Sequence, residues 1–214
     1  MNINPQPLTG HWKEGYALDL HTSSSQPVRE IKTVKTLVDG VETDTLIPGD
    51  IIGWDTKRPE IAEELYRLKY WREKRRAETI GIAAADFLKK KLSAWNISLI
   101  IPIPPSDTTR EFQPVYEIAN HIGKICNLYL DFHTLKQIKY TSQLKEINEP
   151  KKRKEVLNGA FSIQNGSLTG KKILLFDDLY RSGETLNAVC DVIINQGRAK
   201  GVYVLTITKT RSKR

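Results

Sequence analysis

The run Ile173-Leu-Leu-Phe-Asp-Asp-Leu-Tyr-Arg-Ser-Gly-Glu-Thr185 decides the fold class of this 214-residue chain. Its apolar start predicts a buried strand over residues 172–176. Two adjacent carboxylates, Asp177 and Asp178, follow the strand, and a short loop over residues 179–183 leads straight into a helix. In open parallel sheets, ligands gather at the carboxyl ends of the strands, so this strand end is a candidate ligand site.

The residues after this run complete a βαβ unit. A helix is expected over residues 183–196, with Gly197 as its C′ residue, and a second apolar strand over residues 202–207. A short strand, a loop, a helix and another apolar strand imply a parallel sheet with helices packed on its faces. The sequence therefore predicts an α/β fold with a Rossmann-like, parallel-sheet core.

The loop and the helix start have the chemistry of a sugar-phosphate site. Free backbone N–H groups at a helix N-terminus bind anions, and they suit phosphate best. Ser182 and Thr185 add hydroxyl donors, and Gly183 lets the backbone approach a ligand closely. Asp177 and Asp178 can accept hydrogen bonds from the hydroxyls of a ribose whose 5-phosphate lies in the loop. A polar strand end with a Ser N-cap is the simpler alternative, but the full pattern is far more specific.

Residues 1–58 differ from the rest and are interpreted as a β-rich N-terminal extension. Two Val/Thr/Ile-rich strands are expected over residues 31–38 and 41–47. Asp39-Gly40 between them is typical of a two-residue hairpin turn, because both positions need φ > 0. Pro48-Gly49 is expected to end the second strand.

The main domain is expected to span residues 59–214. Pro59 is well placed to begin a helix in which Ile61, Leu65 and Leu68 share one face. The further expected elements are a helix over residues 78–92, an apolar strand over 97–103, a helix over 114–124 and a polar, basic region over 131–160.

The composition favours a cytoplasmic protein with anionic partners. The net charge is +8, from 33 Lys and Arg against 25 Asp and Glu. Basic clusters lie at residues 72–76, 151–154 and 209–214. No apolar run approaches the roughly 20 residues of a membrane helix, and the N-terminus lacks the regions of a signal peptide. Cys126 and Cys190 are expected to be buried free thiols, so a metal site of nitrogen and sulfur ligands is not expected.

The run at residues 173–185 resembles the signature of the type I phosphoribosyltransferases. That signature has four apolar residues, two acids, two apolar residues and then a small-hydroxyl-Gly-x-Thr loop. One position departs from it, since Arg181 lies where the family generally has a small or hydroxyl residue. A guanidinium there can either add a phosphate contact or partly occlude the loop.

Other segments resemble one branch of that family, the ComF-like proteins linked to competence and DNA processing. Ile100-Ile-Pro-Ile-Pro104 resembles the "VPVP" strand of the branch, and Arg110 with Phe112-Gln113 resembles the Arg-rich turn that follows. The four-cysteine zinc element that many of these proteins carry is missing. The remaining similar segments are Leu65-Tyr-Arg-Leu-Lys-Tyr70, Thr141-x-Gln143 and the stretch from Arg153 to Asn158-Gly-Ala-Phe161.

The resemblance implies an enzyme that binds 5-phosphoribosyl-1-pyrophosphate with Mg²⁺ and transfers the phosphoribosyl group to an acceptor. Asp177, Asp178 and Arg110 are the implied catalytic residues, and the two aspartates are also the implied metal ligands. The implied sugar-phosphate site comprises Asp177, Asp178, Leu179, Tyr180, Arg181, Ser182, Gly183, Glu184 and Thr185. The implied pyrophosphate loop comprises Pro105, Ser106, Asp107, Thr108 and Arg110, and the basic region over residues 131–160 would form a mobile hood over the acceptor.

Two other classes of function stay open from the sequence. The same fold can serve as a non-catalytic sensor that binds a sugar phosphate or a nucleotide without turnover. The basic charge and the ComF-like motifs also suit an accessory protein that works with nucleic acid or with a nucleic-acid-processing partner. A homo-oligomer is compatible with each of these interpretations, and the acceptor is not identified.

Overall fold

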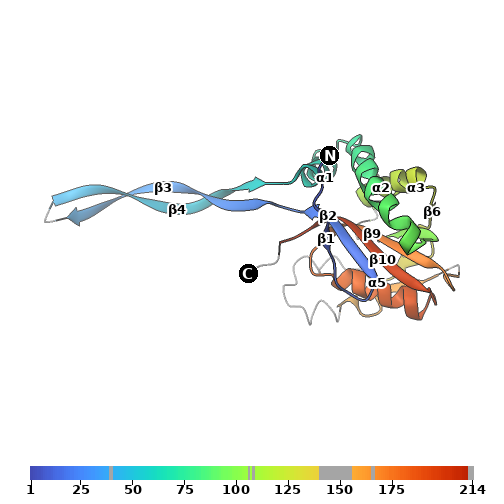
Figure 1. Cartoon of the computed structure of the whole chain (residues 1–214). Coiled ribbons are helices and arrows are strands. Elements are labelled where there is room, and N and C mark those ends of the chain that lie inside the picture. Colours follow the sequence, from blue (N-terminus) through green and yellow to red (C-terminus); the bar gives the residue numbers. More distant parts are fainter. Residues whose placement is uncertain (39–40, 106, 108, 140–155, 165–166, 212–214) are drawn as a thin grey trace. The chain divides into compact units, whose positions relative to one another are not determined.

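The computed structural model describes residues 1–38, 41–105, 107, 109–139, 156–164 and 167–211 (Figure 1). The chain divides into two compact units. The first, the core unit, combines Met1–His21 with Pro59–Arg214, and the second comprises Thr22–Arg58.

The core unit is built on a six-stranded sheet in the order β1-β2-β10-β9-β5-β6. Every neighbouring pair is parallel except β1 with β2, which is antiparallel. The strands are β1 (Gln6–Pro7), β2 (Glu14–Leu20), β5 (Leu99–Pro102), β6 (Tyr129–Leu130), β9 (Lys172–Tyr180) and β10 (Gly201–Lys209).

Strand β9 shows why the sheet needs helices on both faces. Leu174 and Phe176 pack into one hydrophobic cluster, while Ile173 and Leu175 pack into another. Successive side chains of a strand point to opposite faces, so a run that is apolar throughout must be buried on both. All four side chains are fully buried.

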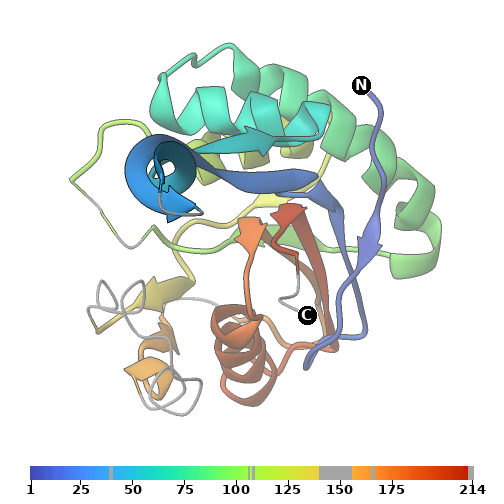
Figure 2. The same ribbon diagram turned by 90° about the vertical axis from the view of Figure 1, so that its left-hand side faces the viewer.

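The helices divide between these two faces of the sheet. Figure 2 shows the teal and green helices on one side of the sheet and the orange-red helix α5 on the other. The predicted α/β fold with a parallel-sheet core is therefore confirmed. The helices are α1 (Glu60–Tyr70), α2 (Arg76–Trp95), α3 (Pro114–Cys126) and α5 (Glu184–Asn195).

The connections that follow the adjacent strands β5 and β9 lead toward opposite edges of the sheet. Strand β5 continues through α3 to β6, and β9 continues through α5 to β10, while β5 and β9 are themselves paired. The direction of winding thus reverses between β5 and β9. Such a reversal opens a crevice at the carboxyl ends of the two strands, which is where open α/β sheets bind ligands.

Residues 1–21 belong to the core sheet, although the sequence predicts one extension over residues 1–58. Strand β2 pairs with β10 in parallel, from Glu14 opposite Tyr203 to Leu20 opposite Lys209. Ala17 and Leu18 are fully buried. The predicted boundary near residue 58 coincides with the end of the second unit, but that unit begins only at Thr22.

The second unit is a two-stranded antiparallel ribbon of β3 (Ser24–Val38) and β4 (Val41–Lys57). Both strands are much longer than predicted. Pro48-Gly49 was expected to end the second strand, which was wrong, because β4 runs through it to Lys57. Each strand of a two-stranded ribbon keeps one free edge, where a proline without an N–H breaks no ladder hydrogen bond.

Charged pairs and hydroxyl contacts connect the two strands of the ribbon. Lys32 Nζ lies 2.7 Å from Asp50 Oδ2, and Lys35 Nζ lies 3.1 Å from Glu42 Oε2. Large apolar side chains are also exposed there, with Ile31 at 73% and Trp54 at 62%. Charges and prolines on free strand edges are a common protection against pairing with another chain.

Gly197 directly follows Gln196, the C-cap residue of helix α5, and is therefore its C′ residue, as predicted. The left-handed conformation occurs one residue later, at Arg198, with φ 54°. Its N–H donates to the carbonyl of Ile194, and the N–H of Ala199 donates to the carbonyl of Ile193. Gly197 is needed for space, since a Cβ there would lie 2.6 Å from the Ile193 carbonyl oxygen.

No helix in the described part of the chain is both long and apolar enough to cross a membrane. Both cysteines are free, and burial raises the pKa of the Cys190 thiol to about 12, with the charge of Asp191 acting in the same direction. Cys126 is half-buried, and burial also raises the pKa of its thiol. Neither thiol is activated toward the thiolate.

Removing the ribbon should leave the core unit folded. The ends of the ribbon adjoin, because Ser24 pairs with Lys57 and the Ser23 N–H donates to the Lys57 carbonyl at 2.8 Å. Replacing residues 24–57 by two glycines is expected to shift the melting temperature by less than about 4 °C. Calorimetry measures this, and loss of cooperative unfolding in the shortened chain would show that the core depends on the ribbon.

Candidate functional site

The carboxyl ends of β5 and β9 place two loops side by side. Pro102 pairs with Phe176, and the Ile103 N–H donates to the Phe176 carbonyl at 2.8 Å. The segment after β5 contains the predicted pyrophosphate loop, and the segment after β9 leads into α5. The two predicted halves of the site therefore start from adjacent strands at the point where the winding reverses.

The two carboxylates of β9 serve different faces of the sheet. Asp177 follows the alternation of Ile173 and Leu175 on the α5 face, and it lines a pocket there. Asp178 is in phase with Leu174 and Phe176 and makes its ion pair with Lys69 of α1. Adjacent strand residues cannot both point to one face, so Asp177 lines the pocket while Asp178 forms the ion pair.

Lys69 is a site residue to which the sequence analysis gave no role. Its Nζ donates to Asp178 Oδ2 at 2.8 Å, and the side chains of Lys69 and Asp178 are 27% and 13% exposed. Burial alone would lower the pKa of Lys69, but the charge of Asp178 and the hydrogen bond to it raise the pKa above its ordinary value. This ion pair ties the last turn of α1 to the end of β9.

Asp177 lies in surroundings that oppose its negative charge. Burial raises the pKa of Asp177 to about 7, and the neighbouring charge of Asp178 acts in the same direction. The Asp178 N–H donates to Asp177 Oδ1 at 2.8 Å, and this bond and the charge of Lys69 partly offset the rise. A cation or a hydrogen-bond donor in the pocket would favour the ionised carboxylate.

The loop between β9 and α5 is shorter than predicted. Leu179 and Tyr180 were expected in the loop, but both are still in β9, where they pair with Thr208 and Lys209 of β10. Only residues 181–183 connect the strand to α5. Gly183 has φ 81°, and a Cβ there would lie 2.7 Å from the Tyr180 hydroxyl oxygen, so the turn excludes any larger residue.

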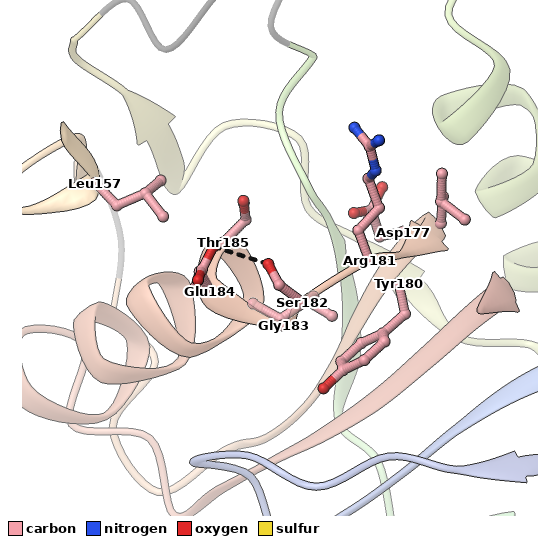
Figure 3. A pocket seen from close by; sticks show the side chains of 10 residues that line it. Leu157, Asp177, Tyr180, Arg181, Ser182, Gly183, Glu184 and Thr185 are labelled. Carbon is pink, nitrogen blue, oxygen red and sulfur yellow. Dashed lines mark hydrogen bonds between the residues drawn. The ribbon is translucent and has the colours of Figure 1, made fainter. Parts of the chain in front are cut away.

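The loop and the helix start enclose a pocket of about 100 Å³. Its labelled side chains come from the end of β9, the start of α5 and the segment before β8 (Figure 3). Eight of its ten residues belong to the sugar-phosphate site that the sequence predicts. The predicted residue Asp178 does not line the pocket, and Leu157 and Leu186 line it in addition. The lining residues are Leu157, Asp177, Leu179, Tyr180, Arg181, Ser182, Gly183, Glu184, Thr185 and Leu186.

The polar groups at the helix start are arranged around Glu184. The Ser182 hydroxyl donates to Glu184 Oε2 at 2.8 Å, as the dashed line in Figure 3 shows. The N-cap position of α5 is occupied by Gly183, one residue after Ser182. The exposed Arg181 side chain extends away from Ser182 and Thr185. In this arrangement the guanidinium leaves the helix start open.

The segment after β5 is ordered around Asp107. Asp107 accepts hydrogen bonds from the backbone and the hydroxyl of Thr109, at 3.1 and 2.6 Å, and its other oxygen lies 3.0 Å from Arg110 Nε. These bonds hold the pKa of Asp107 below its ordinary value. Pro105 is half-buried, whereas Ser106 and Thr108 lie outside the described residues. Arg110 is thus exposed and paired with an acid of its own loop.

Part of the predicted hood is described. Strands β7 (Leu135–Gln137) and β8 (Phe161–Ile163) form an antiparallel pair, and Leu157 between them reaches the pocket. Thr141, Gln143 and the basic run at residues 151–154 lie outside the described residues.

The pocket offers carboxylate oxygens and no ready-made metal cage. Among the described residues, no three His, Cys, Asp or Glu side chains gather as metal ligands. Asp177 makes no ion pair in this part of the chain, so its oxygens are available, and Mg²⁺ commonly binds one or two carboxylates together with substrate phosphates. The donor set therefore fits a magnesium ion that arrives with a phosphorylated ligand.

Neither a protein-family model nor a curated protein matches the sequence. Among solved structures, the chain is similar to a purine phosphoribosyltransferase from Pyrococcus horikoshii Ot3, with 15% identity and a TM-score of 0.36 over 60% of this chain and 78% of that one. It is also similar to a hypoxanthine phosphoribosyltransferase from Staphylococcus aureus, with 13% identity and a TM-score of 0.38 over 62% of this chain and 64% of that one. These TM-scores are too low to support a conclusion about function, which must come from the site itself.

Alanine at Gly183 should destabilise the protein more than alanine at Gly170. Both glycines have positive φ, 81° and 74°, so each substitution costs about 1–2 kcal/mol from the backbone alone. Only at Gly183 does the new Cβ also meet the Tyr180 ring, since nothing lies within 4 Å at Gly170. Urea unfolding of the two variants measures the difference, and equal losses would mean that the ring does not restrict the turn.

Asp177→Asn should gain stability relative to the unchanged protein as the pH rises from about 4 to about 7. In this window the unfolded chain releases the Asp177 proton while the folded chain retains it, so ionisation favours the unfolded state. Asparagine has no proton to lose, and the groups that do not interact with Asp177 cancel in the comparison. Urea unfolding across this pH range measures the effect, and parallel stability curves would contradict the raised pKa.

Proposed function

We propose that the chain binds 5-phosphoribosyl-1-pyrophosphate and transfers its phosphoribosyl group to an acceptor. One observation carries the proposal: Asp177, at the end of β9, and the N-terminus of α5 line the same pocket. A carboxylate and a phosphate-binding helix start within one small pocket fit the two ends of a phosphorylated ribose. The assignment to the ComF-like branch rests on the sequence motifs alone.

Each part of the ligand has a partner in this proposal. The 5-phosphate accepts hydrogen bonds from the backbone N–H groups and hydroxyls of residues 182–185. The ribose hydroxyls donate to Asp177, and Asp178 keeps the end of β9 in place through Lys69. Arg110, together with the hydroxyls of Ser106 and Thr108, binds the pyrophosphate after Arg110 exchanges Asp107 for the ligand.

The reaction is a substitution at ribose C1. The bond from C1 to the pyrophosphate oxygen breaks, a bond from C1 to the acceptor forms on the opposite face, and the acceptor loses its proton. The protein aligns the ribose and stabilises the charge of the leaving pyrophosphate. Asp177 would hold a bound Mg²⁺, which would neutralise phosphate charge.

Binding without turnover is the second candidate function. Glu184 occupies the helix start and accepts the Ser182 hydroxyl at 2.8 Å, so a phosphate must displace a carboxylate of like charge. Arg110 is likewise engaged by Asp107. Both contacts favour a sensor that responds to a high ligand concentration over an enzyme with a preformed anion site.

Replacing both Asp177 and Asp178 tests whether the end of β9 forms part of a binding site for 5-phosphoribosyl-1-pyrophosphate. Asp177→Asn with Asp178→Asn should weaken the binding of 5-phosphoribosyl-1-pyrophosphate and Mg²⁺ by at least about 10- to 100-fold in calorimetry, because hydrogen bonds to charged groups are lost. Asp177→Asn alone keeps the Lys69–Asp178 pair and should account for most of the loss.

The matched control removes two carboxylates from helix surfaces, Asp86→Asn with Asp191→Asn, and should bind normally. Unchanged binding by the β9 double variant would remove the basis of the proposal. Pyrophosphate release with a panel of bases, nucleotides and oligonucleotides then distinguishes transferase from sensor, since only a transferase releases it.

A further inference from the structure

A cluster of exposed aromatic side chains lies at the end of helix α1. Tyr70 and Trp71 are 68% and 58% exposed, and both contact the half-buried Tyr66, with ring centroids 4.9 and 6.2 Å apart. The buried face of α1 is formed by other residues, among them Leu65 and Leu68. The rings of Tyr70 and Trp71 are exposed beside that face, and we call Tyr66, Tyr70 and Trp71 the α1 platform.

Positive charge surrounds the α1 platform. The Arg67 guanidinium carbon lies 5.1 Å from the centre of the Trp71 ring and is held by Glu63 at 3.1 Å. It covers one face of an indole that is otherwise largely open. Trp71 is followed by residues 72–76, in which Arg72, Lys74 and Arg75 are exposed.

The acids of this region are already engaged. Arg76 pairs with Glu64 and Glu73, at 2.8 Å each, and the more distant Arg75 lies 3.8 Å from Glu73. Arg72 makes no ion pair within the described residues and takes the left-handed conformation, with φ 56°. Arg72 and Lys74 thus remain available to an anionic partner.

Two contacts place the α1 platform beside the candidate site. Lys69 lies between Tyr66 and Tyr70 in the sequence and reaches Asp178 of β9 at 2.8 Å. Lys74 Nζ lies 5.5 Å from the ring centre of Phe112, in the segment that follows Arg110. Lys69 and Lys74, which flank Tyr70 and Trp71 in the sequence, thus contact the end of β9 and the segment after β5.

We propose that the α1 platform binds single-stranded nucleic acid, with bases stacked on Tyr70 and Trp71 and phosphates on Arg72, Lys74 and Arg75. Open aromatic faces within a ring of cations are the recurring design of surfaces for unpaired strands. A duplex hides its bases inside the helix, and the charges of Arg72, Lys74 and Arg75 complement the phosphates of a strand. The proposal concerns binding alone and does not depend on the sugar-diphosphate site.

Fluorescence anisotropy with a labelled deoxythymidine strand of about 12 nucleotides tests this, against the same strand annealed to its complement. Tyr70→Ala with Trp71→Ala should weaken binding of the single strand by about tenfold or more. Tyr129→Ala, which removes an aromatic ring that is 70% exposed on β6, should bind as the unchanged protein does. Arg72→Ala with Arg75→Ala should weaken binding and flatten its dependence on salt between about 50 and 200 mM.

A second measurement follows Trp71 directly and does not depend on the stability of the alanine variant. Strand binding should quench tryptophan fluorescence in the unchanged protein, and Trp71→Phe should bind the strand but lose that quenching. Calorimetry with 5-phosphoribosyl-1-pyrophosphate should give equal affinity for the platform variants and the unchanged protein, which separates this proposal from the preceding one.

Several results would overturn the proposal. These are no binding of the single strand at about 50 mM salt, tighter binding of the duplex, or quenching that persists in Trp71→Phe. Self-association that Tyr70→Ala with Trp71→Ala abolishes, without any strand binding, would assign the platform to a second copy of the chain instead.

Discussion

The opposite orientation of two adjacent carboxylates at the end of β9 is the constraint on which the site depends. Strand geometry sends Asp177 to the α5 face and Asp178 to the α1 face. Asp178 is satisfied by Lys69, and this pair fixes the end of α1 against the sheet. Asp177 is left in the pocket without an ion pair in the described part of the chain, and its surroundings hold it near the point of losing its proton. A ligand that brings hydroxyl donors or a cation would therefore relieve an unfavourable charge, so the pocket is suited to a polar phosphorylated molecule.

Much of the fold followed from local patterns. The apolar run before Asp177 predicts a strand buried on both faces, and Ile61, Leu65 and Leu68 predict the buried face of α1; both are confirmed. The pairing of β2 with β10 could not be predicted, because it joins residues near opposite ends of the chain. The predicted strands of the ribbon were too short because Pro48-Gly49 is typical of a strand end. The free edge of a two-stranded ribbon tolerates a proline, so β4 continues through this pair. Local sequence also could not show that Leu179 and Tyr180 continue β9, since that depends on their partners in β10.

The candidate site, like the fold, could be predicted where it depends on local sequence and not where it depends on distant segments. Eight of the ten pocket residues lie in the stretch that the sequence singled out, because strand, acids, loop and helix start follow one another there. Leu157 and Lys69 come from distant segments, and only folding reveals them. The engagement of Ser182 by Glu184 and of Arg110 by Asp107 was equally invisible, since each depends on a side-chain direction. Those two contacts are the structural reason for keeping a sensor that binds without turnover as the second candidate function. The cationic, aromatic end of α1 contacts the end of β9 and the segment after β5, whereas the pocket lies on the α5 face of the sheet.

A crystal structure with bound ribose 5-phosphate is the most direct test of the central claim, because this ligand carries both groups that the pocket is held to recognise. The account predicts the phosphate at the start of α5, within hydrogen-bonding distance of the N–H groups of residues 183–185, with the ribose hydroxyls directed to Asp177. It also predicts that Glu184 has turned away from Ser182. A phosphate bound at the basic residues 72–76 with the pocket empty, or a ribose turned away from Asp177, would contradict it.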